Sequence, residues 1–171
     1  HYKTLAIDNN RASVLQSLGR SESALEVFLD VLERTITVYG PDHAEVVEMR
    51  SNVAVSYMNL ERFAEAKEEL DGALASLDRG ETELPVMRIR VEMNLAVTLE
   101  GLGEVEEALR VSERVLNGLE ELVGEGHQQS LISRNNHAMT LLGQERFGEA
   151  VELARRNLEL AEEHQPGHPY N

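Results

Sequence analysis

The sequence contains no cysteine and no tryptophan, and aromatic residues make up only 4% of its 171 positions. Without cysteine the chain forms no disulfide and offers no thiolate for catalysis or metal binding. A core with so few aromatic side chains must be built mainly from Leu, Val and Ala, which favours helices over sheets. The composition therefore predicts an all-α fold and fits a cytoplasmic location.

Basic residues are also scarce, because 16 Lys and Arg stand against 31 Asp and Glu, giving a net charge of -15 at pH 7. Nucleic acids and anionic membranes are bound through clusters of basic side chains. We therefore expect no direct binding to nucleic acid and no membrane association. The chain also lacks any apolar run close to the roughly 18 residues that a spanning helix needs.

What the sequence does contain is one pattern written four times with a period of 42 residues. Four registers keep this spacing without slippage: Asn10, Asn52, Asn94, Asn136; Ala12, Ala54, Ala96, Ala138; Ala24, Ala66, Ala108, Ala150; and Leu32, Leu74, Leu116, Leu158. A period of 20 to 50 residues is typical of arrays in which each repeat stacks on its neighbours. We expect a single array with repeats at about 1–42, 43–84, 85–126 and 127–168.

Residues 169–171 match the opening of the other repeats, so we expect the chain to be a fragment of a longer array. Apolar residues at three-and-four spacing, with Gly and Pro between the runs, predict two helices in each repeat. The expected helices are 4–18, 21–38, 44–60, 64–78, 85–102, 104–123, 129–142 and 148–164.

Two motifs point to a known family. The first predicted helix of each repeat carries a small residue followed by a large one three positions later, as in Ala54 with Tyr57. The hairpin carries an aromatic residue followed by Glu and Ala, as in 63–66 and 147–150. These motifs resemble the tetratricopeptide repeats of the 42-residue kinesin-light-chain type, which many bacterial regulatory proteins contain. The resemblance implies a right-handed superhelical solenoid of four helix-turn-helix repeats.

In that family the first helix of each repeat lines a concave groove, so the resemblance places ligand binding on the first helices. Val and Met would form the floor, and Asn amides would pair with the backbone of an extended peptide. The residues that we expect at this groove are Asn10, Ser51, Asn52, Val55, Met58, Arg90, Met93, Asn94, Val97, Arg134, Asn135, Asn136 and Met139. In the alternative interpretation, each Asn ties neighbouring helices together and the methionines are partly buried in the core.

Arginines at 50, 88, 90 and 134 fall on or beside the first helices of an otherwise acidic chain. One hypothesis is a positive patch for a carboxylate of the ligand, since Arg pairs with carboxylates through two parallel hydrogen bonds. The alternative is that these arginines form salt bridges with Glu48 and Glu92.

Motifs for metal, phosphate or dinucleotide binding are absent from the sequence, so we expect no catalysis and no cofactor. His43 and His127 fall at matching positions between repeats and are interpreted as helix caps. The expected function is an interaction module that binds a peptide or protein segment. The alternatives are a regulatory segment that contacts another domain of the same chain, and a homo-oligomer formed through exposed array ends.

Overall fold

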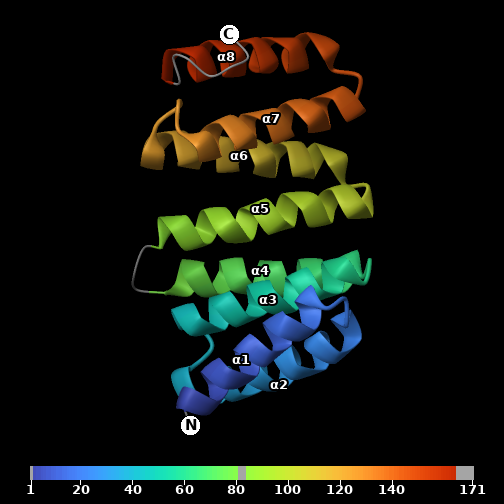
Figure 1. Ribbon diagram of the computed structural model, residues 1–171, viewed down its shortest axis with the longest axis vertical. Coiled ribbons are helices and arrows are strands. Elements are labelled where there is room, and N and C mark those ends of the chain that lie inside the picture. Colours follow the sequence, from blue (N-terminus) through green and yellow to red (C-terminus); the bar gives the residue numbers. More distant parts are fainter. Residues whose placement is uncertain (1, 81–83, 165–171) are drawn as a thin grey trace. The chain divides into compact units, whose positions relative to one another are not determined.

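The computed structural model describes residues 2–80 and 84–164, and every regular element in these two ranges is an α-helix (Figure 1). The helices are α1 (Tyr2–Ser17), α2 (Ser21–Tyr39), α3 (Ala44–Asn59), α4 (Phe63–Arg79), α5 (Pro85–Leu102), α6 (Val105–Val123), α7 (Gln128–Gly143) and α8 (Phe147–His164). The prediction of two helices in each repeat is confirmed. The expected start of a further repeat at 169–171 lies outside the described residues.

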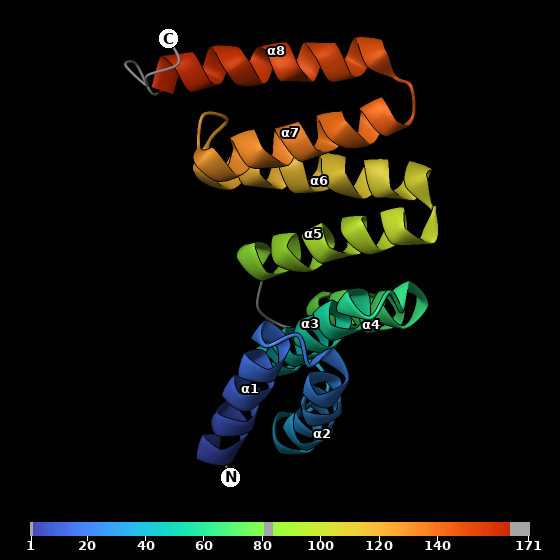
Figure 2. The ribbon, with the colours of Figure 1, turned by 45° about the vertical axis from the view of Figure 1, so that its right-hand side comes forward.

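The chain divides into two compact units, 1–102 and 103–171. In the N-terminal unit, α1 packs on α2, α2 on α3, α3 on α4 and α4 on α5. In the C-terminal unit, α7 packs against both α6 and α8, and Figure 2 shows it lying between them. Each helix therefore contacts the helices that adjoin it in the sequence of its own unit, as expected for an array of repeats.

Alanines of the repeated registers lie at these helix contacts. Ala12, Ala24, Ala54 and Ala66 are completely buried in the N-terminal unit. Around the first hairpin, Phe28, Val31 and Leu32 of α2 pack with Val46 and Val53 of α3. In the C-terminal unit, Leu109, Leu141 and Ala150 form a second cluster with Leu153. Because the side chain of Ala is small, it lets two helices pack closely, and a larger side chain would not fit at the same contact.

The turn inside each repeat requires one residue with a left-handed backbone. Gly19 and Gly103 meet this requirement with φ of 72° and 75°. Glu61 and Glu145 occupy the same position in the other two repeats, with φ of 57° in both. Glycine adopts this conformation without steric cost, whereas a glutamate does not. At the end of α2, Gly40 is also left-handed and Pro41 follows it, which ends the helix as the sequence predicts.

Helices long and apolar enough to cross a membrane are absent from the described part of the chain.

Candidate functional site

The first helices of the N-terminal unit are α1, α3 and α5, and they lie next to one another. Asn52 on α3 donates a hydrogen bond from Nδ2 to Oδ1 of Asn9 on α1, over 3.2 Å. Gln16 of α1 donates a longer one, 3.4 Å, to Ser56 of α3. Helices α3 and α5 are also in contact. Asn52, a residue predicted at the groove, therefore joins α1 and α3 through Asn9. Asn10, also predicted at the groove, is exposed.

Apolar residues of the predicted groove floor are accessible on α5. Val97 is 52% exposed, Met93 is exposed one turn earlier, and the half-buried Asn94 lies beside them. On α3, Val55 and Met58 are half-buried. These side chains lie on first helices of one unit, as the sequence predicts, and they leave apolar surface open to solvent.

Ser51, which was placed on the same predicted face, is buried instead. Its hydroxyl donates to the carbonyl oxygen of Val47 over 3.0 Å, one turn back in α3. The Ser51 hydroxyl can donate a hydrogen bond to a ligand only if this bond within α3 breaks.

The arginines differ from one another in exposure. Arg90 on α5 is exposed. Arg50 forms an ion pair of 2.6 Å with Glu69 of α4, and Arg88 forms one with Asp78. Arg50 and Arg88 therefore form ion pairs, as the alternative interpretation expects. Their partners are Glu69 and Asp78, whereas that interpretation named Glu48 and Glu92.

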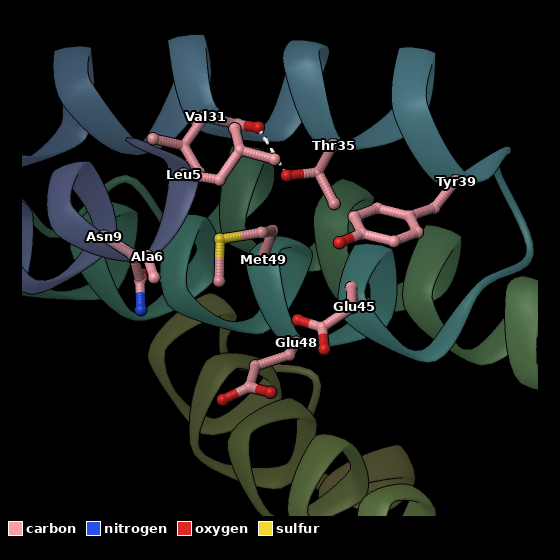
Figure 3. Close-up of a pocket in the computed structure, with 9 residues that line it drawn as sticks. All are labelled: Leu5, Ala6, Asn9, Val31, Thr35, Tyr39, Glu45, Glu48 and Met49. Atoms are coloured by element: carbon pink, nitrogen blue, oxygen red, sulfur yellow. Dashed lines mark hydrogen bonds between the residues drawn. The ribbon is translucent and has the colours of Figure 1, made fainter. Parts of the chain in front are cut away.

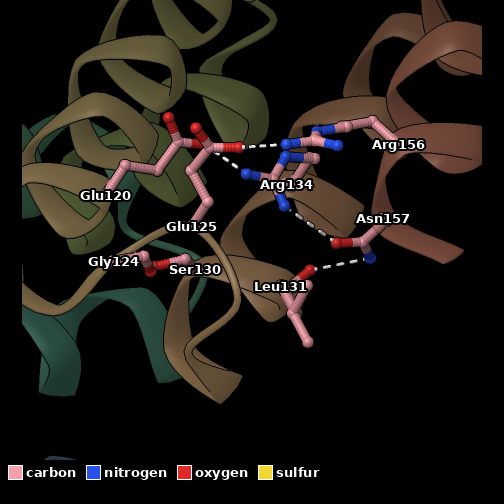
Figure 4. Close-up of polar contacts among 8 residues, drawn as sticks. All are labelled: Glu120, Gly124, Glu125, Ser130, Leu131, Arg134, Arg156 and Asn157. Atoms are coloured by element: carbon pink, nitrogen blue, oxygen red, sulfur yellow. Dashed lines mark hydrogen bonds and ion pairs between the residues drawn. The ribbon is translucent and has the colours of Figure 1, made fainter. Parts of the chain in front are cut away.

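Arg134 on α7 is only 3% exposed, and Figure 4 shows it between the helices of the C-terminal unit. Its guanidinium forms an ion pair with Glu120 of α6 and donates to Oδ1 of Asn157 on α8, over 3.2 Å. Asn157 in turn donates from Nδ2 to the carbonyl oxygen of Leu131, over 3.0 Å. Arg134 thus joins three helices and lies inside their packing.

The remaining predicted residues of the C-terminal unit, Asn135, Asn136 and Met139, are exposed on α7. Beside them, His137 is half-buried and its Nδ1 lies 2.6 Å from the hydroxyl oxygen of Ser112 on α6. Burial lowers the pKa of His137 below its usual 6.5, against the opposite effect of Glu113. The neutral imidazole is therefore the form that fits this helix contact.

The interpretation of His43 and His127 as caps is confirmed. Each precedes the first residue of a helix, and each Nδ1 accepts a hydrogen bond of 3.2 Å from the backbone N–H two residues later. In the first turn of α7, the hydroxyl of Ser130 also donates to the carbonyl oxygen of Gly124, which follows α6, over 2.8 Å (Figure 4). These contacts satisfy backbone groups that helix ends leave without partners.

A cavity that sequence analysis did not foresee lies where α1, α2 and α3 meet (Figure 3). Its volume is about 110 Å³, and it is lined by Leu5, Ala6, Asn9, Val31, Thr35, Tyr39, Glu45, Glu48 and Met49. Three helices contribute to it, so no pattern within a single helix could have revealed it. Clusters of side chains that could hold a metal ion are absent from the described residues.

Comparison with known proteins gives a consistent result. The tetratricopeptide repeat family model matches residues 3–79 and 87–163. The Drosophila melanogaster protein "Tetratricopeptide repeat protein 19 homolog, mitochondrial" is 26% identical over 134 residues, which are 78% of this chain. Those residues make up 36% of that relative, so the chain spans about a third of its length.

Solved structures show the same fold. The crystal structure of nearly identical TPR-like repeats from Podosopora anserina, a protein named for the kinesin light chain, superposes with a TM-score of 0.82 at 22% identity. The match covers 98% of this chain and 79% of that one. A Rap protein complexed with competence and sporulation factor gives a TM-score of 0.76 at 17% identity, over 93% of this chain and 43% of that one.

Proposed function

Because the chain belongs to the tetratricopeptide repeat family, a fold that generally serves as a protein-interaction scaffold, we propose that it binds an extended peptide segment along the first helices α1, α3 and α5 of its N-terminal unit. The observation that carries this proposal is the exposed apolar surface of Met93 and Val97 on α5, with the Asn94 amide beside it. Apolar side chains supply binding energy, and an amide pairs with a peptide backbone whatever the sequence of the ligand. The ligand can belong to another protein or to another segment of the same polypeptide.

Further support comes from α7 of the C-terminal unit, where Met139 is 59% exposed and Asn135 and Asn136 are exposed with it. The same combination of an accessible methionine and asparagines thus recurs on first helices of both units. Methionine adapts its shape to varied partners. A Rap protein of similar fold has been solved in complex with a factor, which is a precedent for ligand binding by this architecture.

The test uses peptides selected from a random 12-residue library on the intact chain. Their affinity is then measured by fluorescence anisotropy for the wild type, Val97→Gln and Val38→Gln. Val38 is the matched control, because it is a valine of similar exposure on the second helix α2. We expect Val97→Gln to weaken binding about tenfold, since it removes roughly one buried apolar side chain from the complex.

Val38→Gln should leave the affinity unchanged. If the selected peptides bind both variants as well as the wild type, or lose affinity only with Val38→Gln, the first-helix groove is not the binding surface.

A second candidate function is self-association through the two end helices. On α1, Ile7 and Val14 are exposed, with Ile7 at 65%. On α8, Val151 and Leu158 are each 60% exposed. The residues that match Val151 and Leu158 in the first repeat, Leu25 and Leu32, are buried. An exposed face of α8 and an exposed face of α1 resemble the two halves of the contact that α2 and α3 make.

Contacts of this head-to-tail kind join copies into rings or open chains. Light scattering over a dilution series tests this candidate, with Val151→Glu as the variant and Val123→Glu, also on an exposed apolar residue, as the control. We expect the apparent mass to rise with concentration for the wild type and the control only. A mass that is constant at every concentration rules self-association out.

A further inference from the structure

The cavity between α1, α2 and α3 combines an apolar floor with a polar rim. Leu5, Val31 and Met49 are buried around it. Thr35 also lines the floor, but its hydroxyl donates to the carbonyl oxygen of Val31 over 2.7 Å, so that proton is already in use. The space among the residues that line the cavity has a volume of about 110 Å³.

The rim carries two carboxylates from one helix. Glu45 and Glu48 are three residues apart on α3, so they lie on the same side of it, and Figure 3 shows them with Tyr39 around Met49. Within the described residues, no ion pair or side-chain hydrogen bond engages either carboxylate. Tyr39 is held in place by stacking on His43, with ring centroids 4.7 Å apart. The cavity mouth thus presents concentrated negative charge beside an aromatic ring.

The repeat itself does not require this pair of acids. The positions that match Glu45 and Glu48 hold Met87 and Arg90 in the third repeat, and Gln129 and Ile132 in the fourth. Two like charges one turn apart repel each other slightly. The second repeat alone accepts that cost, and it does so at the mouth of a cavity.

We propose that this cavity binds the side chain of a lysine from the peptide that occupies the first helices, an inference that rests on the proposed function. A cavity of about 150 Å³ holds benzene, which has six heavy atoms, so 110 Å³ suits the five heavy atoms of a lysine side chain. The methylene groups contact Leu5, Val31 and Met49. The ammonium group reaches the two carboxylates and the Tyr39 ring, which attract it through charge-assisted hydrogen bonds and a cation–π contact.

The experiment titrates the intact chain with two short peptides, acetyl-Gly-Gly-Lys-Gly-Gly-amide and the same peptide with norleucine in place of lysine. Norleucine keeps the alkyl chain and lacks the ammonium group, and the blocked termini leave lysine as the single cation. Binding is followed through the methyl NMR signal of Met49, which lines the cavity. We expect a saturable shift of this signal with the lysine peptide and a binding at least about tenfold weaker with norleucine.

Variants separate the cavity from general attraction to an acidic protein. Glu48→Gln should weaken binding of the lysine peptide about tenfold. Glu68→Gln makes the same change in net charge at an exposed position on α4, away from the cavity, and should leave binding unchanged. Equal effects of the two variants would show that the peptide responds to net charge alone, and would overturn the proposal.

The signal of Met93 on α5 distinguishes this proposal from the proposed function. If library-selected peptides shift Met93 and lose affinity with Val97→Gln, but the lysine peptide leaves Met49 unshifted, the first-helix groove stands and the lysine site does not. If the lysine peptide shifts Met49 while no selected peptide depends on Val97, the cavity binds lysine and the groove proposal fails.

Discussion

Gly101 and Gly143 occupy the same position in successive repeats, but a methyl group would meet different surroundings at each. A Cβ at Gly101 would lie 2.6 Å from ring carbons of Phe63, whereas one at Gly143 would meet nothing within 4 Å. We expect Gly101→Ala to lower the free energy of unfolding by about 1 to 3 kcal/mol, because the ring must move. Gly143→Ala should be neutral or raise it by about 0.4 to 1 kcal/mol. Urea denaturation of both variants is the check, and equal effects would contradict the close contact.

The half-buried His137 should make stability depend on pH. Since its pKa in the folded chain lies below 6.5, the unfolded chain binds a proton in the interval between the two values that the folded chain does not bind. Its contribution is therefore complete above about pH 6.5 and is lost as the pH falls through that interval. Glu113, Arg146 and Glu149 also act on the ring, but burial is the largest influence.

His137→Leu supplies the comparison, because Leu95 is the matching residue of the third repeat. We expect the variant to lose less stability than the wild type between about pH 7.5 and pH 5.5, in urea denaturation at each pH. Parallel pH profiles for the two proteins would show that His137 does not contribute.

Arg90 and Arg134 allow a test of buried against exposed charge. Arg134→Gln removes the partner of Glu120 inside the packing of three helices, and should lower the free energy of unfolding by about 1 to 3 kcal/mol. Arg90→Gln changes an exposed side chain and should stay within about 0.5 kcal/mol of the wild type. Similar thermal midpoints for the two variants would mean that the Arg134 contacts contribute little.

At the scale of a helix, α7 depends on a cap that is unusual in its chemistry. The imidazole of His127 accepts the backbone N–H of Gln129, a role that Ser, Thr, Asn and Asp fill most often. His127→Ala should lower the free energy of unfolding by about 0.5 to 2 kcal/mol, whereas His127→Asp should preserve or raise it, since a carboxylate also favours the helix N-terminus. Amide hydrogen exchange in the first turn of α7 measures the effect directly. Unchanged protection in His127→Ala would show that the cap is dispensable.

Helix positions could be predicted closely from the sequence, because the spacing of apolar residues and the Gly and Pro residues between the runs agree with the packing of the helices. The predicted helix 85–102 has the observed bounds of α5, and the others differ by one or two residues. The small differences have physical causes. Phe63 and Phe147 were placed in the turns, but each begins a helix, since the left-handed turn residue lies two positions earlier, at Glu61 and Glu145.

The site was less predictable, because exposure depends on neighbouring helices. Ser51, Met93 and Asn135 hold the same position in successive repeats, but Ser51 is buried and the other two are exposed. Arg134 was expected at a ligand surface, and its partner Glu120 is on another helix, with no pattern linking the two positions. The cavity proposed to bind lysine is lined by residues of α1, α2 and α3, so the sequence of a single helix does not reveal it. Whether the predicted groove residues bind a ligand stays a prediction.

For the whole molecule, a net charge of -15 should govern how a cationic ligand arrives. The long-range attraction acts within a Debye length of about 10 Å at 0.1 M salt and about 3 Å at 1 M. We expect added salt to slow association of the lysine peptide and weaken its binding, while binding of the norleucine peptide changes little. Stopped-flow association rates at about 0.05 and 0.5 M NaCl provide the measurement. Equal salt dependence of the two peptides would contradict electrostatic steering by the chain.

The contact between the second helix of one repeat and the first helix of the next recurs between α2 and α3, α4 and α5, and α6 and α7. Its consequence is genetic. Recombination that duplicates or deletes one repeat length of DNA joins two surfaces that already fit each other, so the gene can change length in whole steps. An insertion of a single codon within a helix instead rotates all later side chains by about 100° and separates alanines from their contacts. The fold therefore tolerates the gain or loss of a whole repeat more readily than the insertion of one residue within a helix.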